Sequence, residues 1–104
     1  MSNKRSGIER IADERLRQIG YEGWTAAHDD EHSDGSLAAA AACYATPFPE
    51  RMMDYSSDTP HGWPFSASWW KPGDGTLEGR IRELEKAGAL IVAEIDRLLR
   101  EKGG

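Results

Sequence analysis

The chain has 104 residues, a net charge of −5 at neutral pH and a single cysteine, Cys43. This length predicts a single domain over residues 1–104, and one cysteine excludes an internal disulfide. The basic residues are interleaved with acidic ones, which argues against nucleic acid as a partner. No run approaches the ~20 apolar residues of a membrane span and no secretory signal is evident, so we expect a cytoplasmic protein that binds no membrane.

The first helical signal covers residues 6–19. Apolar residues recur there at spacings of three and four, which places them on one stripe of a helix. They are Ile8, Ile11, Ala12, Leu16 and Ile19. Ser6 is a typical N-cap and Gly20 a typical terminator. The charged residues between the apolar ones predict a solvated face.

A polar loop is expected over residues 21–35, where the helical period stops. Its densest cluster is His28-Asp29-Asp30-Glu31-His32. The two histidines are four residues apart, and imidazole together with carboxylate suits zinc, manganese or iron. Acidic residues are also favoured just before a helix N-terminus. Capping, ligand binding and metal binding therefore all stay open for this cluster, and capping is the simplest.

A second helix is expected over residues 36–46. Its run of alanines combines the highest helix propensity with small side chains that let neighbouring helices approach closely. Ser33 or Asp34 is suited to cap its N-terminus, and Pro47 with Pro49 ends it.

Residues 47–75 form a long connection with no sustained period, and they hold all five prolines and three of the four tryptophans. Such long loops in compact domains are usually functional or disordered. The aromatic residues predict that the segment docks onto the helices, with residues 49–60 as its most mobile part. If the chain is extended at Trp69 and Trp70, their side chains point to opposite faces, so one of the two is expected to be exposed.

The third helix, over residues 76–101, is the clearest element. Its apolar residues step alternately by four and three, which is a heptad seam that packs against another helix. They are Leu77, Ile81, Leu84, Gly88, Ile91, Ile95 and Leu98. Gly88 in this seam predicts a close helix crossing. At about 39 Å by its rise of 1.5 Å per residue, the helix is longer than a small globule requires, which favours a homo-oligomer formed through it.

Together these elements predict an all-α fold, with a three-helix core and a long aromatic-rich loop between the second and third helices. Flat aromatic side chains stack on nucleobases, and nearby cations bind phosphates. The competing interpretation is that the tryptophans fill the core or anchor the loop. The candidate ligand-binding residues are Trp24, His28, Asp29, Asp30, His32, Trp63, Trp69, Trp70, Lys71 and Arg80. No catalytic residue and no metal ligand is assigned.

Several sequence blocks occur in order along most of the chain outside residues 47–61. They include Glu22-Gly23-Trp24-Thr25, His28-Asp29-Asp30-Glu31-His32, Trp63-Pro64-Phe65, Trp69-Trp70-Lys71-Pro72 and Lys86-Ala87-Gly88-Ala89-Leu90. This series resembles a family of short phage and prophage proteins of uncharacterised function. The resemblance implies a phage accessory protein that acts in the host cell. A looser similarity is to MazG-like all-α nucleotide pyrophosphohydrolases, which hold magnesium on carboxylate-bearing helices.

Three function hypotheses follow. The leading one is a non-catalytic protein that needs no cofactor and sequesters a small nucleotide-like ligand such as a host-defence signal, by analogy with other compact phage proteins. The first alternative is a nucleotide pyrophosphohydrolase that uses Asp29, Asp30 and neighbouring glutamates with Mg²⁺ or Mn²⁺. The second alternative is a protein-interaction module whose exposed tryptophans dock onto a host protein and inhibit it.

Overall fold

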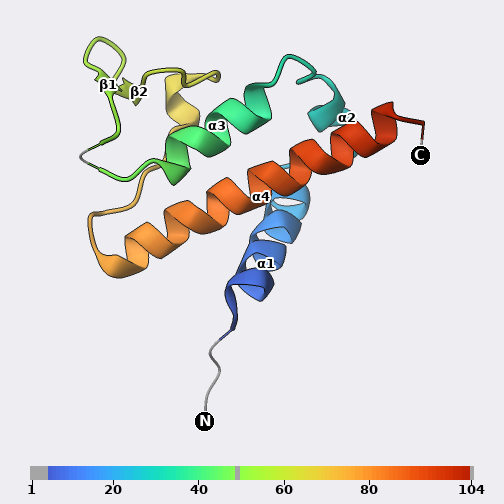
Figure 1. Ribbon diagram of the computed structural model, residues 1–104, viewed down its shortest axis with the longest axis horizontal. Coiled ribbons are helices and arrows are strands. Elements are labelled where there is room, and N and C mark those ends of the chain that lie inside the picture. The colour runs from blue at the N-terminus through green and yellow to red at the C-terminus, as the bar shows by residue number, and fades with distance from the viewer. Residues whose placement is uncertain (1–4, 49, 104) are drawn as a thin grey trace.

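The computed structural model describes residues 5–48 and 50–103. The protein is mostly helical, as predicted, and the described residues form four α-helices, whose arrangement can be followed in Figure 1. They are α1 (Gly7–Gly20), α2 (Ala26–Asp30), α3 (Ser36–Ala45) and α4 (Leu77–Glu101). Residues 1–4, 49 and 104 lie outside the described residues. Two predictions include some of them: the single domain over residues 1–104, and Pro49 as a helix terminator.

Two segments expected to be irregular contain regular structure. The polar loop 21–35 includes α2, which Thr25 caps by accepting a hydrogen bond from the His28 backbone N–H at 3.4 Å. The connection 47–75 includes a 3₁₀ helix, η1 (Ala67–Trp69), and the antiparallel strands β1 (Met53–Asp54) and β2 (Thr59–Pro60). These elements span only two to five residues, too few to show a hydrophobic period. The all-α prediction therefore holds only approximately.

The helix boundaries follow from local capping. Ser6 caps α1 as predicted, and it forms a reciprocal capping box with Glu9. Helix α1 ends at Gly20, which is its last residue and not, as predicted, the first residue after it; Tyr21 is the C-cap. At the start of α3 the N-cap is Gly35, with φ +86°, while the Asp34 carboxylate accepts a hydrogen bond from the Ser36 N–H at 3.1 Å.

The core lies between α3 and α4, and the aromatic loop packs against it. It consists of Leu37, Ala40, Ala41, Tyr44, Ala87, Leu90 and Ala93, with Trp24, Trp63, Phe65 and Trp70 packed against them. Tyr44 fixes the loop, because its hydroxyl donates to the Trp69 carbonyl at 3.5 Å and accepts from the Lys71 N–H at 3.1 Å. The prediction that the tryptophan-bearing segment docks onto the helices is confirmed.

Helix α1 crosses α4 at Gly88, as Figure 1 shows for the two helices. A Cβ atom at Gly88 would lie 2.6 Å from Cδ1 of Ile11, so the two helices approach closely there. The predicted close crossing at this glycine is therefore confirmed.

The orientation of the apolar stripes differs from the prediction. Helix α1 buries Glu14, Arg15 and Gln18, while Leu16 and Ile19 are exposed, so its charged face is not simply a solvated one. Most of the α4 seam is likewise exposed or half-exposed, and α4 packs on α3 through a different face that carries Ala87, Leu90 and Ala93. Within the described chain, no helix is both long and apolar enough to cross a membrane.

Buried polar residues hold the C-terminus of α3. Arg51 donates to the Cys43 carbonyl at 3.0 Å, and Arg80 donates to the carbonyls of Tyr44 and Ala45 at 2.9 and 2.5 Å. The Glu83 carboxylate accepts hydrogen bonds from both arginines and from the Gly73 N–H at 2.8 Å. Glu83 thereby connects α3, α4 and the end of the loop. Without it, polar groups in these segments would lose their hydrogen-bond partners.

Candidate ligand-binding site

An aromatic pocket of about 170 Å³ forms where the loop meets α2 and α3. It is lined by Trp24, His28, His32, Leu37, Phe65, Ser66 and Trp69. Four of these seven residues were predicted from the sequence to bind a ligand. The structure thus brings residues of the His-Asp cluster and of the tryptophan-bearing segment together, although they lie more than thirty positions apart.

The rings around the aromatic pocket form a continuous wall. Trp24 stacks on His28 with ring planes 3° apart and centroids 5.8 Å apart, and its ring lies 5.6 Å from that of Trp69. His28 meets His32 edge to face at 4.9 Å, and His32 meets Phe65 in the same manner at 5.1 Å. Such a wall suits a flat aromatic ligand such as a nucleobase.

A buried ion pair positions His28. Asp29 has no exposed surface; its carboxylate accepts from the Arg15 guanidinium at 2.7 Å, and its second oxygen lies 3.2 Å from Nδ1 of His28. Since Arg15 comes from α1, this pair attaches α2 to α1 and fixes the orientation of the imidazole ring. Asp29 therefore supports the pocket from behind instead of facing it.

A second pocket, of about 230 Å³, shares Trp24 and Trp69 with the first and is rich in charge. We call it the cationic pocket. Its lining includes Glu14, Arg17, Gln18, Tyr21, Glu22, Tyr44, Lys71, Arg82, Lys86 and Leu90. Four cationic side chains and two carboxylates thus line a space that adjoins the aromatic pocket at the two shared tryptophans.

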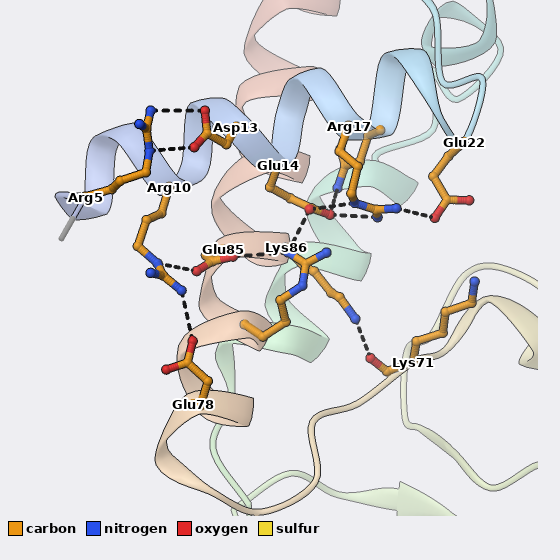
Figure 2. Close-up of polar contacts among 12 residues, drawn as sticks. Arg5, Arg10, Asp13, Glu14, Arg17, Glu22, Lys71, Glu78, Glu85 and Lys86 are labelled. Carbon is orange, nitrogen blue, oxygen red and sulfur yellow. Dashed lines mark hydrogen bonds and ion pairs between the residues drawn. The ribbon is translucent and has the colours of Figure 1, made fainter. Parts of the chain in front are cut away.

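Arginines hold the buried carboxylate of the cationic pocket in place. Glu14 accepts from Arg17 at 2.8 Å and from Arg82 at 2.7 Å, and Arg17 also pairs with Glu22 at 3.1 Å (Figure 2). Burial alone would raise the pKa of Glu14, but the hydrogen bonds from Arg17 and Arg82 outweigh it and lower that pKa. Glu14 therefore stays ionised and fixes both guanidinium groups at the edge of the pocket.

Two lysines of the cationic pocket have no carboxylate partner among the described residues. Figure 2 shows Lys86 of α4 reaching toward the loop, where its ammonium donates to the Lys71 carbonyl at 2.8 Å. Burial, together with the nearby charge of Arg82, lowers the pKa of Lys86. The ammonium also lies 5.5 Å from the centroid of the Tyr44 ring. A partly desolvated positive charge that is held by neutral partners favours the approach of an anion.

The other predicted residues lie elsewhere. Trp63 and Trp70 pack against the core, and Trp69, 41% exposed, is the one of the two adjacent tryptophans that lines both the aromatic and the cationic pocket; one exposed tryptophan was expected. Arg80 lines a different cavity of about 650 Å³ and donates to the end of α3. Trp70 lines the same further cavity as Arg80. Asp30 pairs with Arg100 at 2.8 Å near the end of α4 and lines neither pocket.

Sequence reasoning missed the helical half of the cationic pocket. Glu14 and Gln18 on α1, and Arg82 and Lys86 on α4, are each four residues apart and so share one helix face. This spacing was a usable signal, but it resembles the solvated face of an ordinary amphipathic helix. A pocket wall can be told from a solvated helix face only when the structure shows that the polar faces of α1 and α4 meet.

Comparison with protein-family models, curated proteins and solved structures finds no match. In the part of the chain that the structure describes, no group of three or more histidine, cysteine or acidic side chains is arranged to hold a metal ion. The chemistry of the two pockets is therefore the basis for a functional assignment.

Proposed function

We propose that this chain is a non-catalytic binding protein that encloses a small nucleotide-like anion. A nucleobase stacks in the aromatic pocket, and the phosphates lie in the cationic pocket beside Lys71 and Lys86. The observation that carries this proposal is the shared wall of Trp24 and Trp69, which joins an aromatic pocket to one with two lysines that have no carboxylate partner in the described part of the chain. In its host the protein would act as a phage accessory protein that sequesters a defence signal.

The size and chemistry of the two pockets support this assignment. Their volumes, about 170 and 230 Å³, together reach the range of ~300–1,000 Å³ that is typical of small-molecule sites. Stacking on aromatic side chains stabilises a bound base by about 1–3 kcal/mol and tolerates different bases. The lysines would add charge-assisted hydrogen bonds to phosphate oxygens.

The arrangement of the carboxylates supports binding instead of metal-dependent hydrolysis. Arg15 pairs with Asp29, and Arg17 and Arg82 pair with Glu14. These contacts use the carboxylate oxygens that would otherwise coordinate magnesium or manganese. The acidic groups thus hold the walls of the site in a fixed shape, which favours tight binding because little ordering remains to be done when a ligand enters.

Titration calorimetry with ADP-ribose, cyclic nucleotides and the unphosphorylated nucleosides tests the proposal. We expect saturable binding of at least one phosphorylated compound, and Trp69→Ala should weaken it at least tenfold because a stacking surface is lost. Tyr55→Ala is the matched control, since Tyr55 is an almost fully exposed aromatic residue that lines neither pocket. Absence of saturable binding across the panel would contradict the proposal.

Lysine variants separate the two halves of the site. Lys71→Gln and Lys86→Gln should each weaken binding of the phosphorylated ligand while leaving the weak affinity for its nucleoside unchanged. Lys102→Gln, at the exposed end of α4, controls for the change in net charge. Chemical analysis of the ligand after release distinguishes sequestration, which returns it intact, from hydrolysis, which does not.

A further inference from the structure

Two polar groups in the wall of the cationic pocket lack a hydrogen-bond partner in the described part of the chain. They are the amide Oε1 of Gln18, a residue that is 2% exposed, and the indole Nε1 of Trp24. Both residues line the cationic pocket, and the backbone N–H of Trp24 donates to the Gln18 carbonyl at 2.9 Å. Because an unpaired buried polar group is unfavourable, a ligand that supplies the missing partners gains affinity.

The neighbouring carboxylate fixes the orientation of the Gln18 amide. Its Nε2 donates to the Glu14 carboxylate at 3.3 Å, and that carboxylate is held by Arg17 and Arg82. If the amide were turned by half a rotation, its oxygen would face an anionic oxygen, and the contact would be repulsive. The Oε1 atom is therefore directed away from Glu14 and requires a donor from elsewhere.

Trp24 lies where the two pockets adjoin. Its ring stacks on His28 in the aromatic pocket, with ring planes 3° apart, and it also lines the cationic pocket. Its indole N–H only donates, so it requires an acceptor. Gln18 lines the cationic pocket but not the aromatic one. A ligand group that meets both side chains must therefore lie beyond a base that is stacked in the aromatic pocket.

The two unpaired groups select the chemistry of their partner. A hydroxyl group both donates and accepts, so sugar hydroxyls satisfy Gln18 Oε1 and Trp24 Nε1 together. An ionised phosphate oxygen only accepts and would leave Gln18 unpaired, whereas an ammonium group only donates and would leave Trp24 unpaired. In a nucleotide the ribose lies between the base and the phosphates, and Trp24 has the corresponding position between the two pockets.

We propose that Gln18 and Trp24 recognise the ribose of the ligand. Gln18 Oε1 accepts a hydrogen bond from a ribose hydroxyl, and Trp24 Nε1 donates one to a hydroxyl oxygen. The protein therefore selects ribonucleotides over analogues that lack these hydroxyls. This inference rests on the proposed function, because it places the ribose between a base in the aromatic pocket and phosphates in the cationic pocket.

Titration calorimetry with ADP and 2′,3′-dideoxy-ADP tests the assignment, because the two compounds differ only in the ribose hydroxyls. Wild type is expected to bind the dideoxy compound at least roughly tenfold more weakly, since the buried groups of the site then stay unpaired. Gln18→Met keeps a side chain of similar length without the amide, so the ratio of the two affinities should fall by at least about threefold. Lys86→Gln is the matched control. It should weaken the binding of both compounds, which share their phosphates, and leave the ratio unchanged.

NMR spectra of the indole N–H groups report the same contact in the wild-type protein. The Trp24 Nε1–H signal, assigned with Trp24→Phe, should move further downfield with ADP than with the dideoxy compound, because only ADP supplies a hydroxyl oxygen. Trp63 is the internal control. Its Nε1–H already donates to the Ser66 carbonyl at 3.0 Å, so its signal should respond equally to both compounds. This measurement decides the matter even if Gln18→Met does not fold.

Equal affinities of wild type for the two compounds overturn the ribose assignment and leave the proposed function standing. Equal shifts of the Trp24 signal do the same, as does a folded Gln18→Met that keeps the full ratio of affinities. ADP carries every group that the assignment requires, so absence of ADP binding overturns it as well. The proposed function is then decided by the binding of ADP-ribose and cyclic nucleotides, which is measured separately.

Discussion

The two sides of α4 are built from opposite kinds of residue. The side toward α3, the loop and the cationic pocket carries Glu83, Lys86 and small apolar residues, whereas the outer side carries Leu84, Ile91 and Ile95. The buried carboxylate on the inner side has hydrogen-bond partners, while the apolar side chains on the outer side are about half-exposed. A hydrophobic stripe in the sequence therefore does not by itself show which side of a helix the rest of the chain buries.

Substitution of Glu83 should have the largest effect on stability. Glu83→Ala leaves Arg51 buried without its carboxylate and removes the acceptor for the Gly73 N–H. Breaking a buried pair of this kind costs about 3–5 kcal/mol of the free energy of unfolding. The neighbouring Leu84→Ala should cost less than about 1 kcal/mol, because Leu84 is already half-exposed.

Chemical denaturation of the two variants measures this difference. A similar loss at both positions would mean that Leu84 is packed as tightly as Glu83 and that the contrast between the two sides of α4 is wrong. Glu83→Gln sharpens the experiment, since it keeps the shape of the side chain and removes only the charge.

Acid should weaken the inner side of α4 selectively. Burial alone would raise the pKa of Glu83, but hydrogen bonds from the Gly73 N–H, Arg80 and Arg51 outweigh it, and the pKa is lowered from the ordinary 4.5. Because the folded-state pKa lies below the unfolded-state one, this stabilisation is complete above about pH 4.5 and is lost as the pH falls through the folded-state value. Glu14, whose pKa is lowered as well, adds to the same dependence.

The free energy of unfolding, measured between about pH 6 and pH 3, checks this expectation. Wild type should lose stability steadily below about pH 4.5, and Glu83→Gln should lose less over the same interval. Equal slopes for the two proteins would show that Glu83 does not titrate with the lowered pKa.

The crossing of α1 over α4 at Gly88 should give an effect of intermediate size. A Cβ atom at this position would lie 2.6 Å from Ile11 Cδ1, so Gly88→Val forces the helices apart and should cost about 1–3 kcal/mol. Ile11→Ala in the same chain should recover part of this loss, because it removes the atoms that collide. Gly20→Ala is the control, since a Cβ atom there meets nothing within 4 Å and stability should change by less than about 0.5 kcal/mol.

The sequence predicts those parts of the structure whose signal lies within one segment of the chain. The three longer helices and the Ser6 cap follow from periods and capping residues that lie within one segment. The short α2 and the β1–β2 hairpin were missed, because side-chain caps at Thr25 and Asp54 determine them and leave no period. The direction in which each helix face points was also missed.

The candidate site shows the same division. Trp24, His28, His32, Trp69 and Lys71 were found because unusual residue types cluster in the sequence. Asp29, Asp30 and Arg80 were placed with them by proximity, whereas the structure uses them in ion pairs and in a helix cap. Lys86 was missed, because only the docking of the loop onto α4 converts a lysine of ordinary appearance into a wall of the pocket.

The pH dependence of ligand binding should give the smallest effect, and it tests whether Lys86 belongs to the site. Its pKa is lowered from the ordinary 10.5, mainly by burial, so it loses its charge at a lower pH than an exposed lysine does. A phosphate bound by the Lys86 ammonium should therefore bind more weakly as the pH rises toward the pKa of free lysine. Lys86→Arg keeps a guanidinium that stays charged throughout this range, so its affinity should fall less. Because both proteins share every other group in the pocket, the difference between their pH profiles reports Lys86 alone, and identical profiles would place the phosphates elsewhere.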